Sequence, residues 1–133
     1  MKVLFVCVHN SGRSQIAEAV FNHEAARLGL DARAESAGTV AGSVVNPVAV
    51  EALEEIGVEA SGLRPKQLTA KMVEEAERIV SMGCGVDADA CPARFVVTED
   101  WGLDDPAGLP IEDVRRIRDE IVVRVRALLK ETA

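Results

Sequence analysis

Short apolar runs alternate with segments of helical periodicity along this chain. Residues 2–8, KVLFVCV, form a continuous apolar run rich in β-branched side chains, which predicts a strand buried on both faces. From Ser14 to Leu28 apolar positions recur at helical spacing, and Gly29 provides a C-terminal stop. Residues 31–36 carry a weaker strand pattern. The pattern therefore predicts strand, helix and strand in succession.

The rest of the chain continues this alternation. Asn46 and Pro47 are a typical helix cap and first-turn proline, and they predict a helix that Gly57 ends. The most regular helix is predicted near the C-terminus, where apolar residues keep helical spacing through residues 111–130. Between these two helices we predict a short helix at 68–77 and strands at 78–83 and 94–98.

Alternating strands and helices predict an α/β domain with a parallel sheet. The chain has 133 residues and no repeat, linker or low-complexity segment, so we expect a single domain over residues 1–133. In parallel sheets of this kind, ligands bind beyond the carboxyl ends of the strands. Cys7, Cys84 and Asp105 each follow a predicted strand, and we expect them to meet at one edge of the sheet.

Composition and charge narrow the classes of function. The chain is 48% hydrophobic and 28% charged, as is typical of soluble globular proteins. Its net charge of −7 argues against nucleic acid or an anionic membrane as a partner. The apolar run before His9 is too short for a signal peptide or a membrane span, so we expect a cytoplasmic protein, monomeric by default. Three cysteines in that compartment favour catalysis, redox chemistry or metal binding over a structural disulfide.

The stretch CVHNSGRS, which begins at Cys7, combines a nucleophile with an anion site. Between a strand and a helix, backbone N–H groups and the helix N-terminus favour an oxyanion. Ser11 and Gly12 are small enough to let the backbone come close, and the Arg13 guanidinium matches a tetrahedral oxyanion. We expect a lowered pKa for Cys7 and a hydrogen bond from the Ser14 hydroxyl to its sulfur. The predicted oxyanion-binding residues are Val8, His9, Asn10, Ser11, Gly12 and Arg13.

The same stretch, extended to CVHNSGRSQIAEA, resembles the phosphate-binding loop of low-molecular-weight protein tyrosine phosphatases and of the arsenate reductases that share their fold. DDPAG, residues 104–108, resembles the aspartate–proline loop of that superfamily. The resemblance implies a three-layer sandwich in which helices flank a four-stranded parallel sheet. It implies that Cys7 is the nucleophile and that Asp105 is the general acid that protonates the leaving oxygen. Asn10 and Ser36 match positions that brace the loop by hydrogen bonds.

The scarcity of aromatic residues bears on the substrate. A tyrosine phosphatase needs aromatic side chains to hold a phenyl ring, but this chain has no Tyr, three Phe and one Trp. Ala107 and Gly108 follow Asp105–Pro106, where the phosphatases usually carry aromatic residues. These observations favour a small inorganic oxyanion as the substrate.

The other two cysteines lie in MGCGVDADACP, where Cys84 and Cys91 are separated by seven positions. Zinc usually takes four ligands, and only His9 and His23 could be added to these two thiols, so we expect no metal site. The cysteine spacing and the segment EDWGLDDPAG resemble the arsenate reductases that thioredoxin regenerates. In those enzymes a nucleophilic cysteine is followed by a redox pair.

The resemblance therefore implies reduction of arsenate to arsenite. Cys7 attacks arsenate, Asp105 assists the loss of water, and Cys84 attacks the Cys7 sulfur so that arsenite leaves. Cys91 then frees Cys7, and thioredoxin reduces the Cys84–Cys91 disulfide. The cycle needs no cofactor, and phosphate and sulfate are expected to compete with arsenate. The expected catalytic residues are Cys7, Arg13, Ser14, Cys84, Cys91 and Asp105.

Several alternatives remain open at this stage. Some relatives bind potassium near the loop, but this chain has Lys66 in the matching neighbourhood, where its ammonium could replace the ion. A phosphatase of the same fold and a non-enzymatic thiol or arsenite sensor are the alternative functions. A mycothiol or glutaredoxin system is the alternative to thioredoxin as the reductant.

Overall fold

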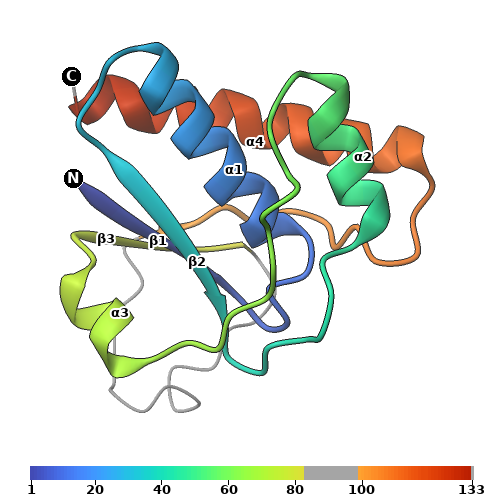
Figure 1. Cartoon of the computed structure of the whole chain (residues 1–133), viewed down its shortest axis with the longest axis horizontal. Helices are drawn as coiled ribbons and strands as arrows, with labels where there is room; N and C mark the ends of the chain where they lie inside the picture. Colours follow the sequence, from blue (N-terminus) through green and yellow to red (C-terminus); the bar gives the residue numbers. More distant parts are fainter. Residues whose placement is uncertain (83–98, 133) are drawn as a thin grey trace.

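The computed structural model of the protein describes residues 1–82 and 99–132. The strands of this part form one sheet, in which every neighbouring pair is parallel and the order is β2-β1-β3-β4 (Figure 1). The strands are β1 (Lys2–Cys7), β2 (Arg33–Gly38), β3 (Arg78–Ser81) and β4 (Glu99–Asp100). The helices are α1 (Arg13–Arg27), α2 (Pro47–Glu55), α3 (Ala70–Glu75) and α4 (Ile111–Thr132).

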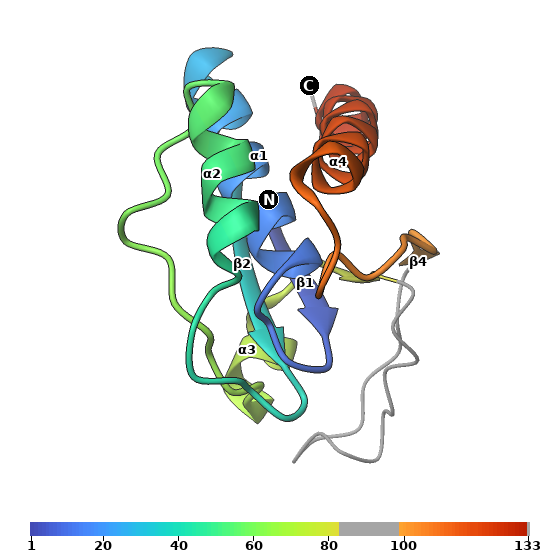
Figure 2. The same cartoon turned by 90° about the vertical axis from the view of Figure 1, so that its right-hand side faces the viewer.

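Helices cover both faces of the sheet, which gives the expected three layers. Figures 1 and 2 show α1, α2 and α4 on one face and α3 on the other. The side chains of β1 alternate between the two apolar clusters that result. Val3, Phe5 and Cys7 belong to the larger cluster, with residues of α1 and α4, and Leu4 and Val6 belong to the smaller one. The predicted α/β fold with a four-stranded parallel sheet is confirmed.

Most predicted elements are present, with shifted ends. The first strand and helix are confirmed as β1 and α1, and the C-terminal helix is confirmed as α4. The Asn46 side chain caps α2 by accepting from the Val48 N–H over 2.9 Å. β2 lies two residues beyond the predicted 31–36, and α3 is shorter than the predicted 68–77 because Thr69 caps it. The strand predicted at 94–98 lies outside the described residues.

The carboxyl end of β1 lies against the end of β2. Cys7 is in register with Gly38, and an added Cβ at Gly38 would lie 2.5 Å from the Val8 carbonyl oxygen. Only glycine admits this approach, which brings the chain after β2 alongside the loop that follows β1. Among the helices of the described residues, none is both long and apolar enough to cross a membrane.

Candidate active site

The loop between β1 and α1 is held from outside by the segment 39–46. Four backbone N–H groups of this segment donate to carbonyl oxygens of the loop over 2.7–3.1 Å: Thr39 to Cys7, Val40 to Val8, Gly42 to His9 and Asn46 to Ser11. Because a trans peptide directs its N–H away from its C=O, outward carbonyls turn the following N–H groups toward the inside of the loop. The loop therefore has the geometry of an anion cradle.

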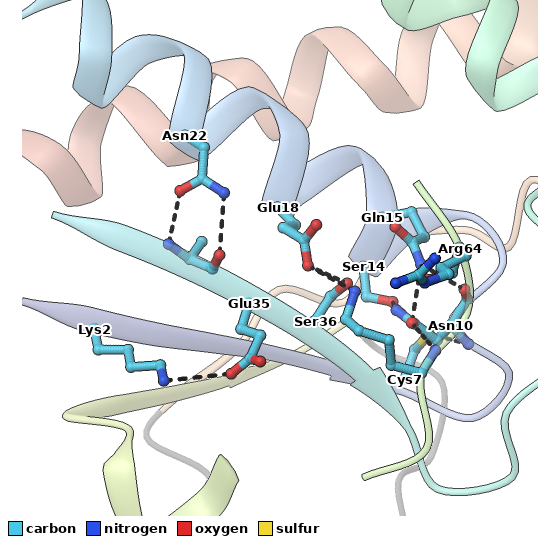
Figure 3. A network of polar contacts seen from close by, with 12 residues as sticks. Lys2, Cys7, Asn10, Ser14, Gln15, Glu18, Asn22, Glu35, Ser36 and Arg64 are labelled. Atoms are coloured by element: carbon cyan, nitrogen blue, oxygen red, sulfur yellow. Dashed lines mark hydrogen bonds and ion pairs between the residues drawn. The ribbon is translucent and has the colours of Figure 1, made fainter. Parts of the chain in front are cut away.

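Cys7 lies at the base of this cradle, where Asn10 and Ser14 contact its sulfur among the described residues. The Asn10 backbone N–H donates to Sγ over 3.1 Å, and Ser14 Oγ is 2.8 Å from Sγ. Ser14 Oγ also accepts from Asn10 Nδ2 over 2.7 Å, so its own hydrogen is available for the sulfur (Figure 3). Two donors favour the thiolate over the thiol. Cys7 is 5% exposed and faces a pocket, so an anion in the cradle can reach it.

Asn10 connects the loop to the segment around Lys66. Its φ angle is +54°, a left-handed conformation that asparagine tolerates better than most residues. Its Oδ1 accepts from the Lys66 backbone N–H and from Gln15 Nε2, both over 2.9 Å. The amide of Asn10 is thereby oriented with its nitrogen toward Ser14. The bracing role that the resemblance gave to Asn10 fits this position.

Arg13 is buried and held by the backbone of two distant segments. One nitrogen, Nη1, donates to the Met82 carbonyl over 3.1 Å and to the Leu103 carbonyl over 2.6 Å. The other, Nη2, lies 3.8 Å from Asp105 Oδ2. Fixed guanidinium nitrogens beside the cradle suit a tetrahedral oxyanion. Arg13 and Asp105, predicted to act together, are thus adjacent.

The aspartate–proline loop packs directly on the cradle. Asp105 is well exposed, and its Oδ1 accepts from the Ala107 N–H over 3.0 Å. Pro106 is buried against Gly12, where an added Cβ would lie 2.7 Å from Pro106 Cγ. Glycine at position 12 is therefore required by this close contact as well as by the approach of an anion.

These segments enclose one pocket of about 730 Å³. No Phe, Tyr or Trp is among the described residues that line it, in keeping with a small oxyanion rather than a phenyl ring. The pocket is lined by Cys7, Val8, His9, Asn10, Ser11, Gly12, Arg13, Gly42, Asn46, Leu103, Asp104, Asp105, Pro106 and Ala107. All six predicted oxyanion-binding residues are in this set. Cys84 and Cys91 lie outside the described residues.

Ser36 was expected to brace the loop by a hydrogen bond, but the partner of its hydroxyl among the described residues is Glu18. The Ser36 hydroxyl donates to Glu18 Oε1 over 2.9 Å, and the Lys66 ammonium donates to the same oxygen over 3.1 Å. Ser36 reaches the loop through Glu18 and Lys66, whose backbone N–H binds Asn10. The Lys66 ammonium thus pairs with the Glu18 carboxylate, and a potassium ion bound at this oxygen would have to displace it.

The side chains of His9 and Gln15, to which the sequence assigned no role, take defined positions. His9 is exposed and its ring Nδ1 lies 3.1 Å from the Val40 carbonyl oxygen, so its imidazole points to the neighbouring segment. Gln15 is fully buried beneath the loop, where its amide contacts Asn10 and the Arg64 carbonyl, yet sequence reasoning did not select it. The one sequence feature that could have indicated this role is an amide side chain in the first turn of a helix that packs on the sheet.

Fold and site together define a class: an α/β protein with a buried cysteine and an arginine on one anion-binding loop. Residues 2–133 match the low molecular weight phosphotyrosine protein phosphatase family, and the chain belongs to this family.

Three known proteins illustrate what the chain is similar to. A glutaredoxin arsenate reductase of Synechocystis is 33% identical over 129 residues, 96% of this chain and 95% of that protein. The structure of a thioredoxin-dependent arsenate reductase of Corynebacterium glutamicum is 37% identical, with a TM-score of 0.77, and the match covers 98% of this chain and 60% of that one. A low molecular weight protein tyrosine phosphatase from T. tengcongensis is 28% identical, with a TM-score of 0.87 and coverage of 98% and 99%.

Proposed function

We propose that this protein is an enzyme that reduces arsenate to arsenite with Cys7 as the nucleophile. The observation that carries the proposal is the position of the Cys7 sulfur. It contacts Asn10 and Ser14 at the base of an anion cradle, beside the fixed guanidinium of Arg13. A thiolate and a bound oxyanion are thereby held together, as attack on the central atom requires. Similarity to arsenate reductases supports arsenate as that oxyanion.

The first step forms a bond between sulfur and arsenic. The Cys7 thiolate attacks arsenate, and one arsenate oxygen leaves as water after Asp105 donates a proton to it. Arg13 and the inward N–H groups of the loop stabilise the charge on the remaining oxygens. Ser14 holds the thiolate before attack. Arsenic remains As(V) in the Cys7 adduct.

The second step transfers two electrons. The Cys84 thiolate attacks the Cys7 sulfur, the electron pair of the sulfur–arsenic bond goes to arsenic, and arsenite leaves as As(III). Two thiols are oxidised to one Cys7–Cys84 disulfide, which balances the reduction. Cys91 then attacks Cys84, frees the Cys7 thiolate and leaves a Cys84–Cys91 disulfide. The cysteines carry both electrons, so the cycle needs no cofactor.

An external dithiol must reduce the final disulfide, and we propose thioredoxin. Support comes from the similarity to a thioredoxin-dependent arsenate reductase and from the second pair of cysteines, which completes the cycle within the chain. A relative named for glutaredoxin makes that system the alternative. The need for reduced thiols at the start of each cycle fits a cytoplasmic protein. Cys7, Arg13 and Asp105 line one pocket within a single chain, and we propose a monomer.

Arsenate-dependent oxidation of NADPH in the presence of thioredoxin and thioredoxin reductase tests this function. We expect sustained turnover by the wild type and none by Cys7→Ser. Exchange of thioredoxin for glutathione and glutaredoxin identifies the reductant. Binding of arsenite without turnover in either system would instead favour a sensor, for which Arg13 and Asp105 are dispensable.

Phosphate-ester hydrolysis is a second candidate function, favoured by one observation. Cys7, Arg13 and Asp105 lie together in the described residues, and ester hydrolysis needs no further thiol. The absence of Phe, Tyr and Trp from the described lining of the pocket favours small or flexible esters over phosphotyrosine. Hydrolysis of p-nitrophenyl phosphate by a Cys84/Cys91 double serine variant measures this activity separately from arsenate reduction.

A further inference from the structure

Among the described residues, the Asn10 carbonyl is the one carbonyl of the anion cradle that accepts from a side chain and from no backbone N–H. The carbonyls of Cys7, Val8, His9 and Ser11 accept from the segment 39–46, and the Gly12 carbonyl accepts from the Ile16 N–H in the first turn of α1. The Asn10 carbonyl accepts instead from Nε2 of Gln15 over 3.1 Å. The Gln15 side chain therefore holds the Asn10 carbonyl by a hydrogen bond, as backbone N–H groups hold the neighbouring carbonyls of the loop.

Gln15 makes two more contacts through the same nitrogen. Nε2 lies 2.9 Å from Asn10 Oδ1 and 2.7 Å from the Arg64 carbonyl oxygen, so its two hydrogens are shared among three acceptors. The side chain is fully buried, and its Oε1 has no hydrogen-bond partner in the described residues. An amide buried with its oxygen unsatisfied is less favourable than an apolar side chain of the same shape. The N–H donors of the Gln15 amide therefore explain why an amide side chain occupies this position.

We propose that Gln15 is a positioning residue for the oxyanion site. By holding the Asn10 carbonyl, it turns the Ser11 N–H into the cradle, because the two groups of a trans peptide point in opposite directions. By donating to Asn10 Oδ1, it keeps Asn10 Nδ2 on Ser14, whose hydroxyl is then free to donate to Cys7 (Figure 3). Gln15 touches neither the anion nor the sulfur and acts through Asn10.

This inference rests on the proposed oxyanion site and predicts two separate losses. Without the Gln15 donors, the Asn10–Ser11 peptide is free to rotate, and one N–H to the anion is lost. Among the described residues, the Lys66 N–H is then the one donor left at Asn10 Oδ1, and the Asn10 amide is held less firmly toward Ser14. Substitution of Gln15 should therefore lower both the affinity for the anion and the stability of the Cys7 thiolate. Substitution of a residue that only stabilises the fold should change neither.

Gln15→Met tests the inference, because methionine keeps the length of the side chain and removes the donors. The matched control is Asn22→Leu, about two turns further along α1, where the amide exchanges two hydrogen bonds with the Ala34 backbone. Three quantities are measured for each protein: the affinity for inorganic phosphate, the pH midpoint of Cys7 alkylation by iodoacetamide, and the free energy of unfolding in urea. Arsenate turnover is not needed for any of them.

For Gln15→Met we expect at least about tenfold weaker phosphate binding and an alkylation midpoint about one pH unit higher. Asn22→Leu should lose stability with both values unchanged. Wild-type values in Gln15→Met would overturn the inference, while a wild type that binds no phosphate would overturn the proposed function instead. If Gln15→Met does not fold, the wild type is titrated with phosphate and followed by NMR. Phosphate should then shift the side-chain N–H resonances of Gln15 and leave those of Asn22 in place. Unshifted Gln15 resonances would refute the positioning role.

Discussion

Gly12→Ala tests whether the close packing of the aspartate–proline loop sets the catalytic geometry. The φ angle of Gly12 is −136°, outside the left-handed region, so the added Cβ is the main change. That carbon would lie 2.7 Å from Cγ of the buried Pro106, against about 3.5–4.0 Å for an ordinary carbon–carbon contact. The loop must therefore retreat by about 1 Å, the difference between these distances. Asp105 precedes Pro106 and moves with it.

A displacement of about 1 Å at a reacting group can cost on the order of 100-fold in rate. We therefore expect kcat for arsenate to fall about 10- to 100-fold in Gly12→Ala, with a smaller change in phosphate affinity, because Arg13 and most of the cradle stay in place. Gly62→Ala is the control, since an added Cβ there meets nothing within 4 Å. Steady-state kinetics of the thioredoxin-coupled reaction measure both parameters. An unchanged kcat in Gly12→Ala would refute the assignment of Asp105 to the chemical step.

Three further predictions concern the acid, a buried carboxylate and the cation position. Asp105→Asn should lower kcat by about 10²–10⁴ with little change in phosphate affinity; equal kcat values would exclude a general acid at this position. Burial raises the pKa of Glu24, but hydrogen bonds from Arg27 and Arg126 outweigh it and hold that pKa below its usual value. Its stabilisation is therefore present above the unfolded-state pKa and is lost as the pH falls through the lower folded-state pKa. Urea unfolding should show Glu24→Gln about 2 kcal/mol less stable than the wild type at pH 7, with the difference disappearing in acid. Wild-type turnover should be equal in potassium and sodium salts, and Lys66→Ala should gain a dependence on potassium; a potassium requirement in the wild type would contradict the position of the Lys66 ammonium.

The sequence was sufficient for the features that depend on local pattern. The apolar run that ends at Cys7 and the helix that follows fix a strand–loop–helix unit, and such a unit places Cys7 and Arg13 on one anion-binding loop. The predicted cap Asn46 and the first-turn proline Pro47 open α2 as expected, since both depend on neighbours in the chain. Asp105 was expected at the same sheet edge as Cys7, and the parallel order of the strands brings its Oδ2 to 3.8 Å from Arg13 Nη2.

Features that depend on distant partners were missed or misplaced. Gln15 looked like an ordinary helical residue because its acceptors, at Asn10 and Arg64, lie across a loop and in another segment. Ser36 was expected to form a hydrogen bond with the loop, but its hydroxyl donates to Glu18 instead. The strand pattern around Ser36 does not indicate this partner on α1. The start of β2 was also placed too early, because the register with β1 decides it and the weak local pattern does not.

A single-turnover experiment tests the proposed role of Cys7 most directly. Fully reduced protein, free of external thiol, receives one equivalent of arsenate, and arsenite and remaining thiols are then counted. We predict about one arsenite and the loss of two thiols per wild-type molecule, with no arsenite from Cys7→Ser, and a Cys7–Cys84 disulfide recovered by peptide mapping from Cys91→Ser. Arsenite formation by Cys7→Ser, or arsenite from the wild type without loss of thiols, would contradict the proposed mechanism.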